Sequence, residues 1–347
     1  MSFALGAYKV NIGRYARQTV FSRIGKAGQE KLLKSKVTII GMGALGTVSA
    51  NNLCRSGVGY IRMVDRDYVE LTNLQRQILY IESDARQNLP KAIAAYNHLS
   101  EINSGITLEP IVADANPSNI ESLISGADLV LDATDNWEIR FLINEICHKQ
   151  KIPWIYGAAL GAEGMTMNIL PEDGKPCLMC FVGGSMPSPS HSCSTFGVLN
   201  MITNVIASIQ TAEAIKILTG SDSVRPDLLT VDLWENNIAA IEIKKNDDCP
   251  VCVHNQYEYF GKISGSCTTN LCGNNSVQVV PSGPVKADFR ALAEKLKAVG
   301  TVRFNQFTLI FEDDKYKITL FLDGRAIIGN AIDGNNAKSI YTEYIGL

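Results

Sequence analysis

The first half of the chain alternates short apolar runs with longer segments of helical periodicity. Five apolar runs lie at residues 36–40, 59–65, 106–112, 127–132 and 152–156, and each has the length of one buried strand. Amphipathic stretches separate the runs, and one of them opens with Pro90, a residue suited to the first turn of a helix. Strands that alternate with helices form βαβ units, so this pattern predicts an α/β fold on a doubly wound, mostly parallel sheet.

The pattern changes beyond residue 160. Residues 165–170, 228–233 and 238–243 alternate apolar and polar positions, which is typical of antiparallel strands with one face exposed. Between the first two, residues 197–220 follow a long helical pattern that ends in glycine, a favoured residue at a helix C-terminus. We therefore expect antiparallel additions to the parallel sheet.

A small second domain is expected at the C-terminal end of the sequence. Residues 264–276 are rich in Ser, Thr, Asn and Gly, so we place a linker at 256–275 after a larger domain at 1–255. The remaining residues, 276–347, follow the order β-α-β-β-β-α. That order predicts a small α+β domain, and the sequence leaves its role open.

Composition and charge exclude several classes of protein. The 347 residues are 46% hydrophobic with a net charge of −3, so a sizeable core is expected and a dedicated nucleic-acid binder is not. The first residues lack the continuous apolar stretch of a signal peptide, and no apolar run is long enough to span a bilayer. The sequence thus predicts a cytoplasmic protein with no membrane partner.

A glycine-rich turn follows the first predicted strand. Gly41, Gly43 and Gly46 fit the pattern GxGxxG between a strand and a helix, which is typical of a Rossmann-like nucleotide site. Glycines there allow the backbone to approach a phosphate, and the helix N-terminus offers free N–H groups to the anion. The alternative is tight packing of strand on helix. Asp65 ends the second strand, where a carboxylate can accept hydrogen bonds from a ribose.

More polar groups follow Asp65 than a dinucleotide would need. They are Asp67, Asn73, Arg76, Gln77 and, at the start of the next helix, Lys91. Arginine and lysine beside a phosphate-binding turn suit a triphosphate, which carries more charge than a pyrophosphate. These residues favour ATP over a nicotinamide cofactor.

An acidic segment, DATDN, follows the fourth predicted strand and faces the same edge of the sheet. Asp135 is well placed there to bind Mg²⁺. The alternative is that Thr134 or Asp135 caps the following helix, and capping and metal binding are both compatible with the sequence at Asp135. Asp132 is expected to be structural.

Four of the nine cysteines form two CxxC pairs. Cys177, Cys180, Cys249 and Cys252 together offer four thiolates for a tetrahedral Zn²⁺. With all four positions filled by sulfur, such a site would be structural and would join two distant segments. The alternative is a set of buried or redox-active cysteines.

A further cysteine, Cys193, lies in a loop rich in Ser, Pro and Gly, just before the helical stretch at 197–220. The field of the helix N-terminus lowers a thiol pKa there, and the loop provides access. Cys193 is thus a candidate nucleophile. The alternative is an ordinary loop residue next to a serine cap.

Several motifs together resemble one enzyme family. RYARQ (14–18), GMGALG, DRDYVELTNLQRQ, LPKA (89–92), DATDN, IPWIYGAALG and the two CxxC pairs stand in the order and spacing of the ThiF/MoeB/HesA family, prokaryotic relatives of ubiquitin-activating enzymes. The resemblance covers about residues 10–255. With the added C-terminal domain, the chain is most similar to the longer ThiF-type adenylyltransferases.

This resemblance implies an activity and roles for the site residues. It implies ATP-dependent adenylation of the C-terminal glycine of a small ubiquitin-fold sulfur carrier ending in Gly-Gly, as in thiamine biosynthesis, with release of pyrophosphate. Asp65 would hold the ribose, and Asp135 would bind the Mg²⁺. The phosphates would be contacted by Asn73, Arg76 and Lys91, and Gln77 would line the same pocket. Arg17 resembles an arginine that family members supply across a homodimer interface, whereas the residue alone suggests a surface salt bridge. Cys193 matches a cysteine that in relatives can bond to the activated carrier.

Other functions stay open on the sequence. The same chemistry could serve a MoaD-like carrier of molybdopterin synthesis or a peptide, and a sulfur-donor protein is a further candidate partner. An NAD-dependent oxidoreductase would use the same glycine turn, but Arg76, Lys91 and the paired cysteines argue against it. A non-catalytic carrier-binding scaffold is disfavoured because Arg17, Lys91 and Asp135 are all present.

Overall fold

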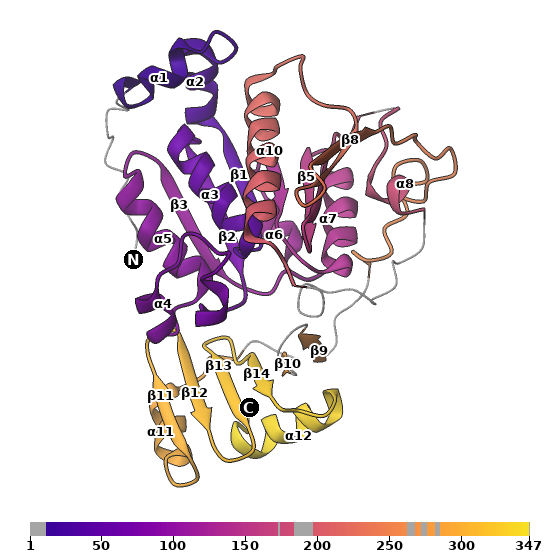
Figure 1. The fold of residues 1–347 in the computed structure, drawn as a ribbon. Helices are drawn as coiled ribbons and strands as arrows, with labels where there is room; N and C mark the ends of the chain where they lie inside the picture. Colours follow the sequence, from indigo (N-terminus) through magenta and orange to yellow (C-terminus); the bar gives the residue numbers. More distant parts are fainter. Residues whose placement is uncertain are drawn as a thin grey trace.

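Two β-sheets organise the part of the chain that the structure describes (Figure 1). The computed structural model describes residues 12–172, 174–183, 197–261, 268–271, 276–281 and 285–346. The larger sheet has eight strands and the smaller one six. Among the described helices, none has both the length and the apolar character needed to cross a membrane.

The eight-stranded sheet has the order β3-β2-β1-β4-β5-β6-β7-β8. Its strands are β1 (Lys36–Ile40), β2 (Tyr60–Asp65), β3 (Thr107–Val112), β4 (Leu129–Asp132), β5 (Trp154–Leu160), β6 (Glu163–Ile169), β7 (Leu228–Asp232) and β8 (Asn237–Ile241). The first five pair in parallel and the last three are added antiparallel. The predicted fold class, a doubly wound sheet with antiparallel additions, is confirmed.

Helices cover both faces of this sheet. Helices α3 (Ala44–Ser56), α5 (Lys91–Ile102) and α10 (Asn200–Thr219) share one apolar core with Val37 and Ile39 of β1. Helices α6 (Ile120–Ile124) and α7 (Trp137–Gln150) share the other core with Ile40. Because both faces of β1 are buried, its sequence is a continuous apolar run rather than an alternating one.

The N-terminal helices lie at the end of the sheet where β1 begins. They are η1 (Ile12–Tyr15), α1 (Ala16–Val20) and α2 (Gly25–Lys34). The Gln18 side chain donates to the Ser56 carbonyl at the C-terminus of α3, at 2.9 Å. In Figure 1 these helices and the smaller sheet lie at opposite ends of the molecule.

The six-stranded sheet is antiparallel, with the order β11-β12-β13-β14-β10-β9. It comprises β9 (Thr268–Leu271), β10 (Ser276–Val279), β11 (Thr301–Phe304), β12 (Thr308–Glu312), β13 (Lys317–Phe321) and β14 (Ala326–Gly329), with α11 (Phe289–Leu296) and α12 (Gly334–Tyr344) packed on it. Apolar residues of β10, β12, β13, β14, α11 and α12 form a core of their own.

Two edge strands of the smaller sheet differ from the prediction. Strand β9 lies inside the range 256–275 that the sequence predicts to be a linker, and the sequence pattern does not predict β11. Backbone pairing with β10 holds β9, whose residues TTNL show no apolar alternation. Strand β11 pairs with β12, and its side chains are largely exposed. Its residues TVRF alternate polar and apolar positions, but over only four residues, a run too short to identify a strand.

Candidate functional site

In the glycine turn between β1 and α3, two glycines are closely packed against the backbone and the third faces open space. Gly41 has φ +95°, and a Cβ there would lie 2.6 Å from the Ala133 carbonyl oxygen. A Cβ on Gly46 would lie 2.0 Å from the Gly41 carbonyl oxygen. At Gly43 the nearest atom to such a Cβ would be Gln77 Nε2, at 3.9 Å. Packing therefore explains Gly41 and Gly46, whereas the missing side chain of Gly43 leaves space in front of the helix N-terminus.

Asp65, at the end of β2, ties this turn to the following loop. Its Oδ2 accepts a hydrogen bond from the Met42 amide at 2.6 Å, and its Oδ1 accepts one from the Asp67 amide at 2.7 Å. Burial raises the pKa of Asp65, while nearby Lys91 acts in the opposite direction. The carboxylate still has lone pairs available, so it can also accept from a hydroxyl of a bound sugar.

Buried Lys91 and partly exposed Asp67 form an ion pair beside the turn. Lys91 Nζ lies 3.1 Å from Asp67 Oδ2, and only 9% of the lysine side chain is exposed. Burial alone would raise the pKa of Asp67, but Lys91 and Arg66 outweigh it and bring that pKa down to about 2. Burial would lower the pKa of Lys91, and Asp67 and Asp65 hold it above its usual range instead. Lys91 is therefore a fixed cation at the edge of the sheet.

Two supporting contacts here were not predicted. The buried Tyr80 hydroxyl lies 2.7 Å from the Met42 carbonyl and 3.1 Å from the Lys91 carbonyl, so it bridges the glycine turn and the start of α5. Arg66 Nη1 lies 3.1 Å from Oδ1 of Asp114, which follows β3. Arg66 belongs to the motif DRDYVELTNLQRQ, but no local pattern indicates its partner.

The loop after β2 positions the other predicted polar residues. Asn73 closes η2 (Leu71–Asn73) by accepting a hydrogen bond from the Glu70 amide at 3.1 Å. Arg76 is half-buried and donates to the Thr72 carbonyl at 3.2 Å. Gln77 is buried beside Gly43, and its Oε1 has no hydrogen-bond partner. This orphaned acceptor fits a site that takes a hydroxyl donor from a ligand.

The acidic segment after β4 separates into three roles. Asp132 is fully buried; its Oδ2 accepts from Arg140 Nε at 3.1 Å and its Oδ1 from the Thr134 amide at 2.9 Å. Asn136 caps α7 by accepting from the Glu138 amide at 2.8 Å, so the alternative in which Thr134 or Asp135 caps this helix is wrong. Asp135 is exposed, and its charge raises the pKa of Lys91 and of Arg66. It thus faces the same cationic edge without a capping role.

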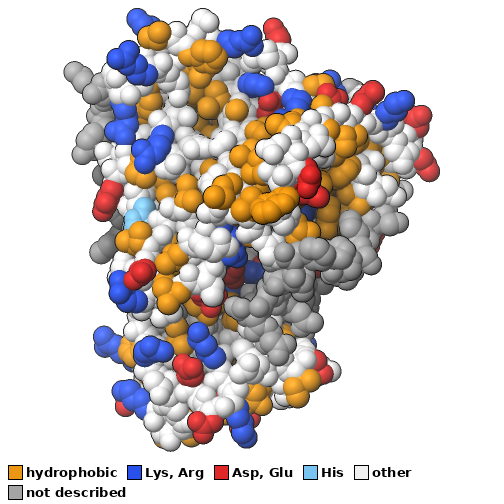
Figure 2. Space-filling model, viewed as in Figure 1, with side chains coloured by type: hydrophobic (Ala, Val, Ile, Leu, Met, Phe, Trp, Pro, Cys, Tyr) orange, Lys and Arg blue, Asp and Glu red, His pale blue; other side chains and the backbone are white. Residues whose placement is uncertain are grey.

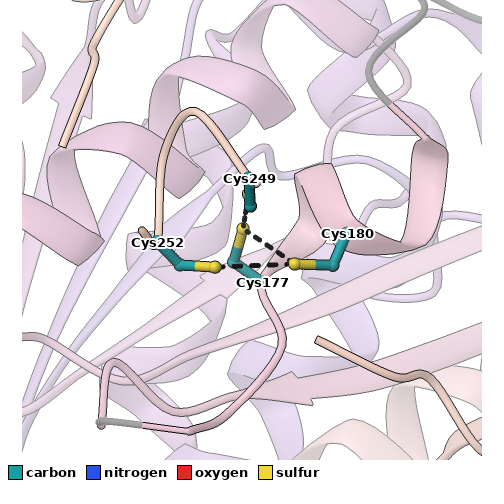
Figure 3. Close-up of side chains that lie close together, drawn as sticks. All are labelled: Cys177, Cys180, Cys249 and Cys252. Carbon is teal, nitrogen blue, oxygen red and sulfur yellow. Dashed lines mark hydrogen bonds between the residues drawn. The ribbon is translucent and has the colours of Figure 1, made fainter. Parts of the chain in front are cut away.

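The two cysteine pairs converge on one cluster (Figure 3). Cys177 precedes α8 (Leu178–Val182), which carries Cys180, and the second pair lies in the turn at 249–252. Neighbouring Sγ atoms are 3.6 Å apart for Cys177 and Cys249, 3.5 Å for Cys180 and Cys252, and 4.0 Å for Cys177 and Cys180. All four lie within 4.8 Å of one another, an arrangement that could hold a metal ion.

Apart from the four cysteines, two predicted site residues do not belong to the sheet edge that carries the glycine turn. Arg17 is exposed on α1, at the end of the sheet where β1 begins, whereas the glycine turn lies where β1 ends (Figure 1). Cys193 lies outside the described residues. The structure brings the other predicted nucleotide-site residues to one edge: the glycine turn, Asp65, Asp67, Lys91 and Gln77, with Asn73, Arg76 and Asp135 in the loops beside them.

Comparisons with known proteins identify relatives over almost the whole chain. A relative from Bacillus subtilis, the sulfur carrier protein ThiS adenylyltransferase, is 40% identical over 337 residues, which cover 96% of this chain and 99% of that protein. The Escherichia coli protein of the same name is 34% identical over 239 residues, covering 69% of this chain and 94% of that one. About two thirds of this chain thus accounts for nearly all of the shorter relative.

Solved structures and a family model agree with these relatives. The crystal structure of E. coli MccB with MccA-N7isoASN matches with a TM-score of 0.62 at 22% identity, covering 70% of this chain and 75% of that one, which shows a shared fold. The ThiF family model matches residues 15–251, a range that includes the glycine turn and the charged groups around it. The chain therefore belongs to the ThiF family.

Proposed function

We propose that this protein uses ATP to adenylate the C-terminal glycine of a ThiS-like sulfur carrier and releases pyrophosphate. The strongest support is the 40% identity to the Bacillus subtilis ThiS adenylyltransferase over nearly the full length of both chains. The arrangement of Gly43, Lys91 and Asp135 at one edge of the sheet agrees with this reaction. We assign the chemistry to residues 1–255 and an accessory role to 276–347.

The reaction forms a bond between a carboxylate oxygen of the carrier and the α-phosphorus of ATP. The bond from that phosphorus to the bridging oxygen breaks, and pyrophosphate leaves with the electron pair. A C-terminal carboxylate is already ionised at neutral pH, so the chain needs no general base. The protein has to hold the reactants in line and to balance the negative charge that grows on the leaving group.

The residues at the sheet edge suit these requirements. Lys91 keeps its charge because of Asp67 and has further N–H donors for a phosphate oxygen, and Arg76 adds a second cation. Asp65 and the free Oε1 of Gln77 are acceptors for the ribose side of the nucleotide. Asp135 is exposed, has no capping role and can ligate Mg²⁺, which when bound neutralises phosphate charge.

Zinc is the metal that best fits the cysteine cluster. Four thiolates around Zn²⁺ at about 2.3 Å place neighbouring sulfurs about 3.8 Å apart. Three of the six separations, at 3.5–4.0 Å, agree with that geometry, and all six are within 4.8 Å. The Asn246 amide and the Asn144 side chain also direct N–H groups at Cys180 and Cys177, which favours thiolates. With four sulfur ligands the site would be structural, joining α8 to the turn at 249–252.

A homodimer would explain the position of Arg17. This arginine cannot serve the nucleotide of its own chain, because α1 and the glycine turn lie at opposite ends of β1 (Figure 1). Apolar side chains gather on the face over α10 and around β8 (Figure 2). Met201 of α10 and Trp234 next to β8 are 55% and 75% exposed. A second copy that covers apolar surface could bring Arg17 to its partner's ATP.

Mixing two inactive variants tests this arrangement. Arg17→Ala and Asp135→Ala proteins should each lose activity, and their mixture should recover part of it, because one site in each mixed dimer has both residues intact. The measurement is carrier-dependent ATP–pyrophosphate exchange after subunit exchange. Mixing either variant with itself is the control. An absence of recovery in verified mixed dimers would contradict a role for Arg17 in trans.

The glycine turn provides a second test. Gly43→Ala should weaken ATP binding by about tenfold with little change in melting temperature, because the added methyl enters the space open to a phosphate. Gly46→Ala should instead destabilise the protein, because its Cβ would overlap the Gly41 carbonyl. Calorimetric titration with ATP and thermal melting separate the two effects. Unchanged ATP affinity in Gly43→Ala would contradict the assignment of a phosphate-binding site to this turn.

The choice of carrier is tested directly. Candidate carriers ending in Gly-Gly, of ThiS-like and MoaD-like type, and a peptide substrate should be compared for adenylate formation. A molybdopterin-synthase adenylyltransferase from E. coli is 35% identical over 240 residues, so a MoaD-like carrier is the second candidate. The ThiS-like carrier should react with the highest kcat/KM. Cys193 stays a predicted site of covalent attachment, and mass spectrometry of the reaction mixture can detect the adduct.

A further inference from the structure

The six-stranded sheet packs on the edge of the larger sheet that carries the nucleotide-site residues. In Figure 1 it lies directly below α4 (Glu82–Arg86), which follows the polar loop after β2. Asn305 donates to the Gln87 carbonyl at 2.9 Å, and Gln278 Nε2 donates to Asp114 Oδ2 at 2.5 Å. The smaller sheet therefore contacts both a backbone carbonyl and a side chain of the larger unit.

The two largest polar side chains buried in this smaller sheet are Gln278 and Arg325. Gln278 of β10 is 0% exposed, and Arg325, just before β14, is 2% exposed. Arg325 Nη1 donates to Gln278 Oε1 at 3.2 Å, and its guanidinium carbon lies 3.9 Å from the centre of the Phe321 ring. Its Nε and Nη2 have no hydrogen-bond partner, and the half-exposed carboxylate of Asp323 lies 3.7 Å from Nε. Burying an arginine with so few partners is costly, so the stability of the smaller sheet gives no reason for this pair.

The pair is linked to Lys91 through a continuous series of polar contacts. Gln278 binds Oδ2 of Asp114, whose Oδ1 lies 3.1 Å from Arg66 Nη1. Arg66 Nε lies 3.8 Å from Asp67 Oδ1, and the other oxygen of Asp67 binds Lys91. Arg66 and Lys91 thus share one carboxylate. Arg66 lies closer to Asp114, at 3.1 Å, than to Asp67, at 3.8 Å, so Asp114 is its nearer ion-pair partner.

We propose that Gln278 and Arg325 are positioning residues for the triphosphate of ATP, acting through Asp114 and Arg66 on the Asp67–Lys91 pair. The inference rests on the proposed function, since it takes Lys91 as a phosphate ligand. It assigns a specific role to the C-terminal unit, which holds one wall of the nucleotide site in place. Because both residues are buried, the carrier should not contact them. Their replacement should therefore change the KM for ATP and leave the KM for the carrier unchanged.

The test replaces both buried polar groups at once. The double variant Gln278→Met/Arg325→Met keeps similar volume and leaves no buried charge unpaired, because Asp323 is half-exposed and Asp114 keeps Arg66. The smaller sheet should therefore stay folded. Its KM for ATP should rise by about tenfold, while the KM for the carrier stays within twofold of wild type. Arg303→Ala, on the exposed side of β11, is the matched control and should change neither constant.

A double-mutant cycle identifies the route. Asp114→Asn should raise the KM for ATP in the same way, and Gln278→Met/Arg325→Met should then add little, because both changes act on one series of contacts. A folded double variant with an ATP KM within twofold of wild type would overturn the proposal, and so would equal changes in both KM values. If the double variant does not fold, Asp114→Asn alone decides by the same criteria.

Lys91→Ala separates this inference from the proposed function. It should abolish binding of a nonhydrolysable ATP analogue in calorimetry. If Lys91→Ala binds the analogue normally, the assignment of the phosphate site is wrong. If Lys91→Ala loses binding while the Gln278, Arg325 and Asp114 variants keep a normal KM for ATP, the site stands and the positioning role is wrong.

Discussion

Replacing Asp135 by alanine is expected to lower carrier-dependent ATP–pyrophosphate exchange on the order of 10³-fold. The carboxylate is the exposed acid at a cationic edge, and its charge acts on Lys91 and Arg66. Without it, Mg²⁺ would lose a protein ligand and the leaving pyrophosphate a counter-charge. The effect should appear in kcat at saturating Mg²⁺, because the lost interaction is strongest in the transition state.

Glu138→Ala is the matched control for this prediction. Glu138 is an exposed acid only three positions further on, in the first turn of α7, and it has no place in the proposed site. Exchange by Glu138→Ala should stay close to wild type. If Asp135→Ala keeps activity within tenfold of wild type, Asp135 is not the magnesium ligand and the metal is held elsewhere.

Replacing Cys249 by serine is expected to remove the bound metal and to lower the melting temperature by more than about 10 °C. The wild-type protein should contain about one zinc per chain. Metal binding to four thiolates is coupled to folding, so its loss should cost several kcal/mol, and each kcal/mol moves the melting temperature by about 2–4 °C in a domain of this size. Elemental analysis and thermal melting with and without a chelator measure both effects.

Cys147→Ala is the matched control. Cys147 is also fully buried, in α7, but lies outside the cluster. Its replacement should leave the zinc content unchanged and cost about 1 kcal/mol, which is typical of a small core substitution. A wild-type protein that is folded and free of zinc, with a melting temperature insensitive to chelators, would exclude the structural metal.

Local sequence determines much of the larger domain. The run KVTII predicts β1 because both faces of a central parallel strand are buried. The glycine pattern predicts the turn because Gly41 and Gly46 meet the backbone at distances that no side chain allows. Both CxxC pairs are local motifs as well. Together they supply the four thiols of one tetrahedral metal site, so the sequence predicts one joint cluster even though the fold between the pairs is unknown at that point.

Capping of α7 shows where local reasoning is insufficient. Three neighbouring residues, Thr134, Asp135 and Asn136, all have side chains that can cap a helix. The choice depends on where the helix begins, and α7 begins at Trp137, directly after Asn136. Once Asn136 takes the cap, Asp135 remains available for another role.

The sequence alone determines the features that are encoded within a few neighbouring residues. These are the parallel strands, the glycine turn, the cysteine pairs and the set of charged groups beyond β2. Tertiary structure decides which charged groups meet. The contact of Gln278 with Asp114 joins residues 164 positions apart, and Arg325 approaches the same network from another part of the smaller sheet. Long-range pairs of this kind leave no periodic pattern, because each partner is compatible with many neighbours until the two sheets pack against each other.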